Sequence, residues 1–281
     1  MNQMTVMKRW CLAMPLAAFA VGCGVEQEDL GSEGAAAPVA EVPAEQTGEA
    51  TQAVGVENAY WWGTSANGYT STNIGSMTNR TCFLSGLQGN LKPAVAGRWA
   101  TGGVLQSAGD YILFVSHNNS KALGVGVQCI YTSAGRTTEM SWAQGQAARL
   151  LGAVTASRRC FLTQVTASGG FTSNSDYVRV WNDGINWYLG GNLSGAGGGR
   201  AVCVNVPEDH GGWLWIAGDP GGFTQNLAYN PGGVACALSG VGGKFDDNSF
   251  TDGVSVDYNS GTRYWEMSVM NGKRGWGNCV K

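Results

Sequence analysis

Apolar and polar residues after residue 53 are spaced in the manner of β-strands, and no window of about 11 residues has a convincing helical period. The tripeptide Asn182-Asp183-Gly184 is a strong hairpin signal, because Asp and Gly tolerate positive φ. It lies between the strand-like segments that contain Val178 and Val180 and Trp187-Tyr188-Leu189. Gln144–Leu151 is the best helical candidate. The pattern predicts an all-β domain of roughly eighteen to twenty strands, at about 8–12 residues for each strand and turn.

The same domain contains three related units. A Cys-Phe-Leu or Cys-Ala-Leu segment recurs at nearly equal intervals, and a second Cys follows each one at a similar distance. Division after each second Cys gives β repeats 54–129, 130–203 and 204–281. Six cysteines allow 15 pairings. The repetition favours disulfides within units, namely Cys82–Cys129, Cys160–Cys203 and Cys236–Cys279.

Strand entries and hairpin tips extend this alignment. Asp176–Val180 and Asp252–Val256 start at the same distance from the first Cys of their repeats, whereas Asp110–Phe114 starts much farther from Cys82. We therefore expect an insertion in repeat 1, and a turn or strand-entry role for the repeated Asp. The expected hairpin tips are Asn182-Asp183-Gly184, Asn259-Ser260-Gly261 and His117-Asn118-Asn119.

Three units that each lack a complete core are expected to pack on one another. The predicted architecture is a closed pseudo-threefold β assembly, of barrel, propeller or flower-like type, because closure removes exposed sheet edges. A row of three small β-sandwiches is the alternative. A β-trefoil fits less well because these repeats are too long for it.

The N-terminal segment has the features of an export signal. Lys8 and Arg9 precede the apolar stretch Trp10–Val21, which is too short to span a membrane, and no apolar run in the chain is long enough to do so. Ala18-Phe19-Ala20 offers a signal-peptidase site, which would give a secreted protein. Ala20-Val21-Gly22-Cys23 resembles the lipobox of bacterial lipoproteins, although Ala20 stands where Leu is usual.

The lipobox resemblance implies a signal peptide over residues 1–22, acylation of Cys23 and a membrane anchor through the lipid. The cysteine count agrees, because Cys11 would leave with the signal, six cysteines pair, and Cys23 is left over. Residues 23–53 contain seven acidic and no basic residues, which predicts a flexible acidic tether.

The net charge of −3 belongs to that tether. All but two of the 17 Lys and Arg residues, and all but seven of the 20 Asp and Glu residues, lie in residues 55–281, so the β domain is near neutral. Nothing in this balance predicts a nucleic-acid partner.

Catalytic motifs are scarce. There is no Gly-x-Ser-x-Gly, His-Glu-x-x-His or Walker loop, and His117 and His210 are the only histidines. We expect no catalytic residue, metal or cofactor. A calcium site around Asp246-Asp247-Asn248 and Asp252 fails the EF-hand pattern, which needs Gly where Thr251 stands. A glycosidase would need a carboxylate pair, for which the candidates are Asp176 with Asp183, Glu208 with Asp209, and Asp246 with Asp247.

Tryptophans recur before each first Cys and on the return strand of the hairpin. Core packing explains them, and a platform on which sugar rings stack is the functional alternative. Trp181 and Asp257 occupy equivalent positions without matching, which is typical of exposed or ligand-facing sites. The recurring set is Trp61, Trp62, Trp142, Trp213 and Trp215. The candidate ligand-binding residues are Trp181, Asn182, Asp183, Trp187, Asn118, Asn259 and Trp265.

We therefore expect a non-catalytic, envelope-anchored lipoprotein that binds carbohydrate or another envelope polymer through its repeats. A structural protein that docks envelope or matrix proteins is the first alternative. A secreted hydrolase with a carboxylate pair is the second.

Overall fold

The computed structural model describes most of the β domain. Its described residues are 55, 57, 60–92, 97–118, 121–207, 209–216, 222–230, 232–250 and 253–281, without the side chains of 209–210, 213–216 and 222–223. Residues Glu49–Lys281 form one compact unit. The signal peptide, Cys23, the tether, Glu208 and Asp252 lie outside the described residues.

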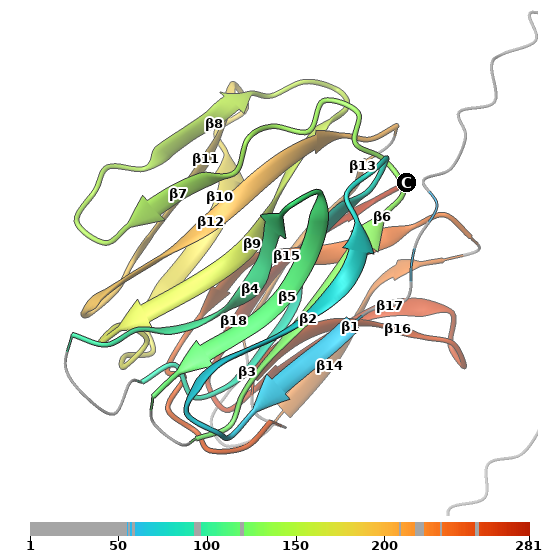
Figure 1. The fold of residues 1–281 in the computed structure, drawn as a ribbon. Helices are drawn as coiled ribbons and strands as arrows, with labels where there is room; N and C mark the ends of the chain where they lie inside the picture. Colours follow the sequence, from blue (N-terminus) through green and yellow to red (C-terminus); the bar gives the residue numbers. More distant parts are fainter. Residues whose placement is uncertain are drawn as a thin grey trace, which may run out of the picture. The chain divides into compact units, whose positions relative to one another are not determined.

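Eighteen β-strands form the described part of the chain, which contains no helix (Figure 1). The all-β prediction is confirmed, and the helical candidate Gln144–Leu151 instead runs into strand β8. Each repeat contributes six strands. Repeat 1 has β1 (Tyr60–Thr64), β2 (Gly68–Ser76), β3 (Thr81–Gly89), β4 (Ala100–Ser107), β5 (Asp110–His117) and β6 (Leu123–Ile130). Repeat 2 has β7 (Met140–Ala143), β8 (Arg149–Ala153), β9 (Arg158–Ser168), β10 (Tyr177–Asn182), β11 (Asn186–Asn192) and β12 (Ala196–Asn205). Repeat 3 has β13 (Asp209–Ile216), β14 (Gly222–Tyr229), β15 (Ala235–Gly242), β16 (Gly253–Asn259), β17 (Tyr264–Met270) and β18 (Arg274–Val280).

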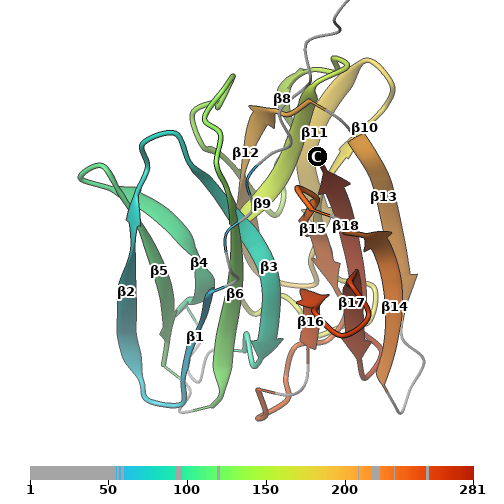
Figure 2. The same cartoon turned by 90° about the vertical axis from the view of Figure 1, so that its right-hand side faces the viewer.

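These strands form three six-stranded antiparallel sheets, each built from two repeats. The first sheet has the order β1-β6-β3-β16-β17-β14, the second β2-β5-β4-β9-β12-β7 and the third β13-β18-β15-β10-β11-β8. In every sheet the first, sixth and third strands of one repeat join the fourth, fifth and second strands of another. Figure 2 shows β2, β5 and β4 on one side of the view and β13 and β14 on the other.

The sharing of strands links repeat 1 to repeat 2, repeat 2 to repeat 3, and repeat 3 to repeat 1. A row of three separate sandwiches does not describe this connectivity. No sheet closes into a barrel, since each keeps two edge strands. The repeats are therefore joined by exchange of strands between open sheets.

The structure corrects the alignment of repeat 1. The fourth strand of that repeat is β4, which starts at Ala100, and Asp110 begins the fifth strand. No insertion precedes the fourth strand, because β4 starts almost as close to Cys82 as β10 starts to Cys160. The Thr101-Gly102-Gly103 segment of β4 has little apolar character, and so the sequence pattern points to the stronger run from Tyr111 instead.

A β-bulge recurs at the same place in the third strand of every repeat. Ser85 has no partner between the pairs Leu84–Val127 and Gly86–Gly126, and Thr163 and Ser239 are skipped in the same way. A bulge shifts the alternation of side chains by one residue. Cys82 and Leu84 face the main core before the bulge, and Leu87 faces it afterwards.

Three disulfides join directly paired residues of the third and sixth strands. They are Cys82–Cys129, Cys160–Cys203 and Cys236–Cys279, each with a Cα–Cα distance of 4.0 Å. The predicted pairing is confirmed. Disulfides of this kind are consistent with export to an oxidising compartment.

Two apolar clusters hold the sheets together. The larger cluster takes residues from all three sheets. The smaller cluster lies where β3, β9 and β15 contact one another, and there the ring centroids of Phe83 and Phe161 are 4.4 Å apart. Ala237 occupies the equivalent position in repeat 3. The Phe or Ala after each first Cys is therefore a contact between repeats.

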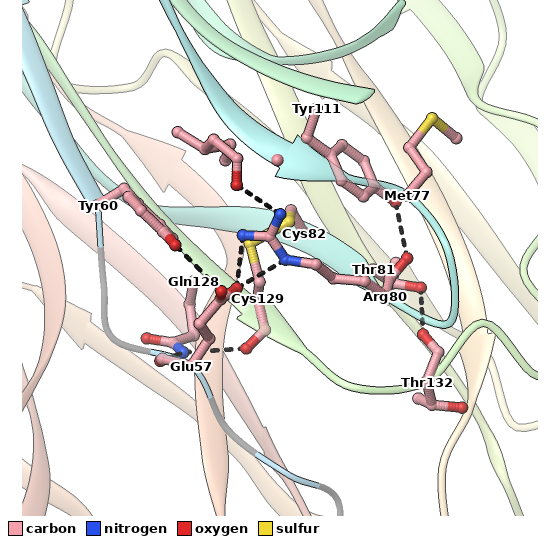
Figure 3. The surroundings of a disulfide bond; sticks show 12 residues. Glu57, Tyr60, Met77, Arg80, Thr81, Cys82, Tyr111, Gln128, Cys129 and Thr132 are labelled. Atoms are coloured by element: carbon pink, nitrogen blue, oxygen red, sulfur yellow. Dashed lines mark hydrogen bonds and ion pairs between the residues drawn. A yellow bond between two sulfur atoms is a disulfide. The ribbon is translucent and has the colours of Figure 1, made fainter. Parts of the chain in front are cut away.

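Around the first disulfide, a buried arginine is fully neutralised (Figure 3). Arg80 donates through Nε to a carboxylate oxygen of Glu57 at 2.6 Å and through Nη1 to the carbonyl oxygen of Ile74 at 2.5 Å. Tyr60 donates its hydroxyl to the other oxygen of Glu57 at 3.0 Å. The guanidinium lies 5.7 Å from the ring of Tyr60 and 6.0 Å from that of Tyr111.

We predict that Phe161→Ala lowers the free energy of unfolding by about 3–5 kcal/mol, because it opens a cavity between repeats. Ile185→Ala is the control, since that side chain is 71% exposed and should change stability by less than about 0.5 kcal/mol. Urea unfolding followed by tryptophan fluorescence measures both. Equal losses for the two variants would contradict the assigned role of Phe161.

Candidate functional site

One tryptophan of each repeat stands at the same register position on the first strand. Trp62, Trp142 and Trp215 pair with residues four before the second Cys of their repeats, namely Val125, Gly199 and Gly275. Trp142 is buried in the main core and Trp62 packs against it. The side chains of Trp213 and Trp215 are not among those described. Trp61 differs, because it is 40% exposed on the outer face of the first sheet.

Two candidate ligand residues are core residues in the structure. Trp187 is 4% exposed and Trp265 is 2% exposed, and both belong to the main apolar cluster. Trp265 donates its Nε1 hydrogen to the carbonyl oxygen of Val234 at 2.8 Å. Neither indole reaches the surface, and so we do not carry them into the proposed site.

The candidate hairpin tips are turns whose polar atoms bind their own backbone. Asp183 Oδ1 accepts from the backbone N–H groups of Asn186 at 2.7 Å and Ile185 at 2.8 Å, which lowers the pKa of this carboxyl. Gly184 adopts positive φ, as the predicted hairpin requires. Asn182 Oδ1 accepts from the N–H of Gly184, and Asn259 Oδ1 from that of Gly261.

Asn118 lies elsewhere. It follows β5, whereas the turn of repeat 1 that corresponds to residues 183–185 joins β4 to β5. Asn118 therefore does not share a sheet end with the other tips, and its assignment to an equivalent position is wrong. The cause is the misplaced fourth strand of repeat 1.

Trp181 belongs to a larger cluster on the outer face of the third sheet. Along β10, Val178 and Val180 face the core, and so Tyr177, Arg179 and Trp181 face outward. We call the cluster the aromatic–arginine face. Its members are Tyr177, Arg179, Trp181, Tyr188, Arg274 and Trp276, all half-buried.

Ring contacts order this face. The indole of Trp181 stacks on Tyr188 with centroids 5.8 Å apart and an interplanar angle of 26°. Tyr177 and Trp276 lie 5.9 Å apart at 48°. The Arg179 guanidinium lies 5.1 Å from the ring of Trp181 and 5.8 Å from that of Trp276, and so it links the two aromatic pairs.

Glycines allow the rings to lie against the sheet. A Cβ on Gly240 would come within 2.6 Å of Arg179 Cβ and 2.9 Å of Trp276, and one on Gly190 within 3.0 Å of Trp181. Any larger residue at Gly240 would displace the side chains that cross it. The high glycine content is thus partly explained by close ring-to-backbone contact.

The equivalent positions of the other two sheets carry different side chains. Strand register aligns Arg179 with Ser255 in the first sheet and Gly103 in the second. It aligns Trp181 with Asp257, as the sequence predicted, and with Leu105. On each sixth strand, two outward residues lie three and five positions before the second Cys. They are Gly126 and Gly124 in repeat 1, Arg200 and Gly198 in repeat 2, and Trp276 and Arg274 in repeat 3.

Sequence reasoning missed Tyr177, Arg179, Tyr188, Arg274 and Trp276 as site residues. A signal exists for Arg179, Arg274 and Trp276, because at least one other repeat carries glycine at each of the aligned positions. The grouping itself needs the pairing of β10 with β15, which joins repeat 2 to repeat 3.

The outer faces of the first and second sheets carry hollows that are lined by other side chains. Trp61, Trp62, Gln88 and Phe250 line one of about 370 Å³ on the first sheet. Beside it Trp61 Nε1 donates to Asp257 Oδ1 at 3.3 Å. A hollow of about 270 Å³ on the second sheet is lined by residues that include Trp99, Gln164, Thr166 and Arg200.

Most of the carboxylates considered for catalysis or calcium already have partners. Asp176 is buried and accepts hydrogen bonds from the backbone of Thr172 and Ser194, in the expected strand-entry role. Asp246 pairs with Lys244 at 2.8 Å, and Asp247 with Lys273 at 3.0 Å. No group of three or more potential metal ligands occurs among the described residues.

Comparison of the chain with protein-family models, curated proteins and solved structures finds no match. Within the described part of the chain, no helix has the length and apolar character needed to cross a membrane.

Asp257 should make stability depend on pH. Burial raises the pKa of its carboxyl above 3.8, and hydrogen bonds from Ser255 and Trp61 oppose this only partly. The folded state therefore favours the protonated form, and this contribution to stability is lost as pH rises through the raised pKa.

We predict that Asp257→Asn, which stays neutral, gains stability relative to the wild type as pH rises from about 3 to about 7. Urea unfolding at a series of pH values measures the difference between the two proteins. Parallel pH profiles would contradict the prediction.

Proposed function

We propose that this protein is an exported, envelope-anchored binding protein that recognises polysaccharide with the outer faces of its sheets. The observation that supports it best is the aromatic–arginine face, where two aromatic pairs lie against glycines of the sheet. Aromatic rings held in this way present apolar surface to the C–H faces of sugars, at little cost in side-chain entropy.

Several features agree with export and anchoring. The three disulfides fit an oxidising compartment, and the lipobox-like segment ending at Cys23 supports acylation. The acidic tether of residues 23–53 would hold the β domain away from the membrane. A pseudo-threefold arrangement of the three sheets would then present several faces to one polymer, so that weak contacts add through multivalency.

Docking of an envelope protein is the second candidate. The hollow on the first sheet favours it, because two exposed aromatic side chains, Trp61 and Phe250, line it. The hydrolase alternative gains no comparable support, since Asp176, Asp246 and Asp247 have structural partners.

We predict that Trp181→Ala weakens polysaccharide binding at least about tenfold, equivalent to roughly 1.4 kcal/mol, because it removes half of the stacked pair. The measurement is affinity electrophoresis in gels that contain soluble polysaccharides, together with co-sedimentation on cellulose, chitin and peptidoglycan.

Ile185→Ala is the matched control, because it removes an exposed apolar side chain from the same hairpin without touching the rings. It should bind as the wild type does. Equal binding by Trp181→Ala, or failure of the wild type to bind any of these polymers and a polyuronate as well, would overturn the proposed function.

A further inference from the structure

We propose that the aromatic–arginine face selects saccharide units that carry a carboxylate, as in a polyuronate. This inference rests on the proposed function and adds to it the charge class of the polymer. Its basis is a pair of arginines on the outer surface that the described residues leave without a counterion.

Arg179 is the centre of the argument. Its guanidinium carbon lies 5.5 Å from the ring of Tyr177, 5.1 Å from Trp181 and 5.8 Å from Trp276. Its Nε is buried without a hydrogen-bond partner. Among the described residues it forms no ion pair. The cation is therefore oriented by aromatic rings, and among the described residues its two Nη groups have no hydrogen-bond acceptor, so that they can donate to another molecule.

Arg274 adds a second positive charge to the same face. It lies 5.9 Å from the ring of Tyr177 and 5.7 Å from that of Trp276. Its Nη2 donates to the carbonyl oxygens of Asn174 at 2.5 Å and Asp176 at 3.3 Å, which position the side chain without neutralising it. The carboxylate of Asp176 is itself buried and accepts from Thr172, Ser173 and Ser194.

The arginine near the first disulfide provides a comparison, because it is a buried structural cation with a carboxylate partner. Arg80 also lies between aromatic rings, and there Glu57 binds it directly (Figure 3). Arg179 has the rings without the carboxylate. The difference is expected if an outside anion supplies the missing charge.

Comparison of the three outer faces leads to the same conclusion. On the second sheet, Arg200 pairs with Glu139 at 3.0 Å. On the first sheet, Asp257 occupies the position of Trp181. The fourth strands of the other two sheets thus have neither an arginine nor an aromatic residue at the positions of Tyr177, Arg179 and Trp181, and so the strand pairing common to the three sheets does not depend on such side chains.

The chemistry of the cluster fits a uronic acid. The rings accept the apolar face of a pyranose, and a guanidinium donates two parallel hydrogen bonds to a carboxylate. Arginine with aromatic rings also suits single-stranded nucleic acid. The three disulfides favour an extracellular polymer, and the test below separates the two ligands.

The experiment compares two polymers that differ only in the carboxylate. Polygalacturonate and its carboxyl-reduced galactan are titrated into the purified full chain by calorimetry, at low and at physiological salt. We expect at least about tenfold tighter binding of polygalacturonate, and a preference that shrinks as salt increases, because the added contact is charged.

Arg179→Gln should remove this preference while leaving binding of the reduced galactan within about twofold. Arg179→Lys keeps the charge but loses the planar fork of N–H donors. Its preference for polygalacturonate should therefore lie between that of the wild type and that of Arg179→Gln. Arg149→Gln is the matched control, because Arg149 is exposed on β8 of the same sheet and none of the ring contacts of the face involves it. It should keep the full preference. Thermal unfolding of each variant confirms that it is folded.

The outcomes separate the two proposals. Equal binding of both polymers by the wild type overturns the carboxylate inference and leaves the proposed function standing. Absence of binding to either polymer, and to those tested above, overturns both. A retained preference in folded Arg179→Gln, or tighter binding of a single-stranded oligonucleotide than of polygalacturonate at equal charge, also overturns the inference.

Discussion

Burial of the third strand of each repeat is the constraint on which the rest of the structure depends. β3, β9 and β15 contact one another, and before the bulge both of their faces are covered. One face enters the core between the sheets, and the other meets the neighbouring repeats through Phe83, Phe161 and Ala237. A repeat that binds its neighbours on two faces cannot complete its core alone, since apolar burial supplies most of the folding free energy. The exchange of strands between repeats follows from this.

The bulge connects that buried centre to the outer surface. Before Ser85, Thr163 and Ser239, alternate residues of the third strand are covered on both sides; beyond them, residues such as Gln88, Gln164 and Thr166 are half-buried. Glycines at several of these outer positions let side chains from adjacent strands cross the sheet. The scaffold therefore provides three faces of one design, on which the side chains are free to differ because the core does not use them.

The differences among the faces are differences of charge and ring content. Asp257 with Trp61 gives the first face an acidic group, and Arg200 with Glu139 leaves the second balanced. Arg179 and Arg274 give the third face positive charge between aromatic rings. Internal repetition of this kind allows one chain to present several related surfaces, with each surface tuned to separate chemistry.

The sequence by itself determined what depends on local pattern. Alternation predicted an all-β chain, recurrence of Cys-x-Leu predicted three repeats and their disulfides, and Asn182-Asp183-Gly184 predicted the hairpin between β10 and β11. These are contacts within a repeat or between paired strands, where spacing along the chain fixes the geometry. The same reasoning did not identify the weakly apolar strand β4, and so it assigned Asn118 to the wrong turn of repeat 1.

Only the tertiary structure decided which tryptophans are core and which are surface. Trp187 and Trp181 lie on the two strands of one hairpin, yet Trp187 is buried and Trp181 stacks on the outer face. Successive side chains of a strand point to opposite faces of the sheet, and which face is the core depends on the packing of the other repeats. The grouping of Arg179 with Trp276 likewise depends on pairing between β10 and β15, which lie in different repeats. Long-range strand pairing leaves no local mark in the sequence, since it is selected by the total burial of all three repeats together.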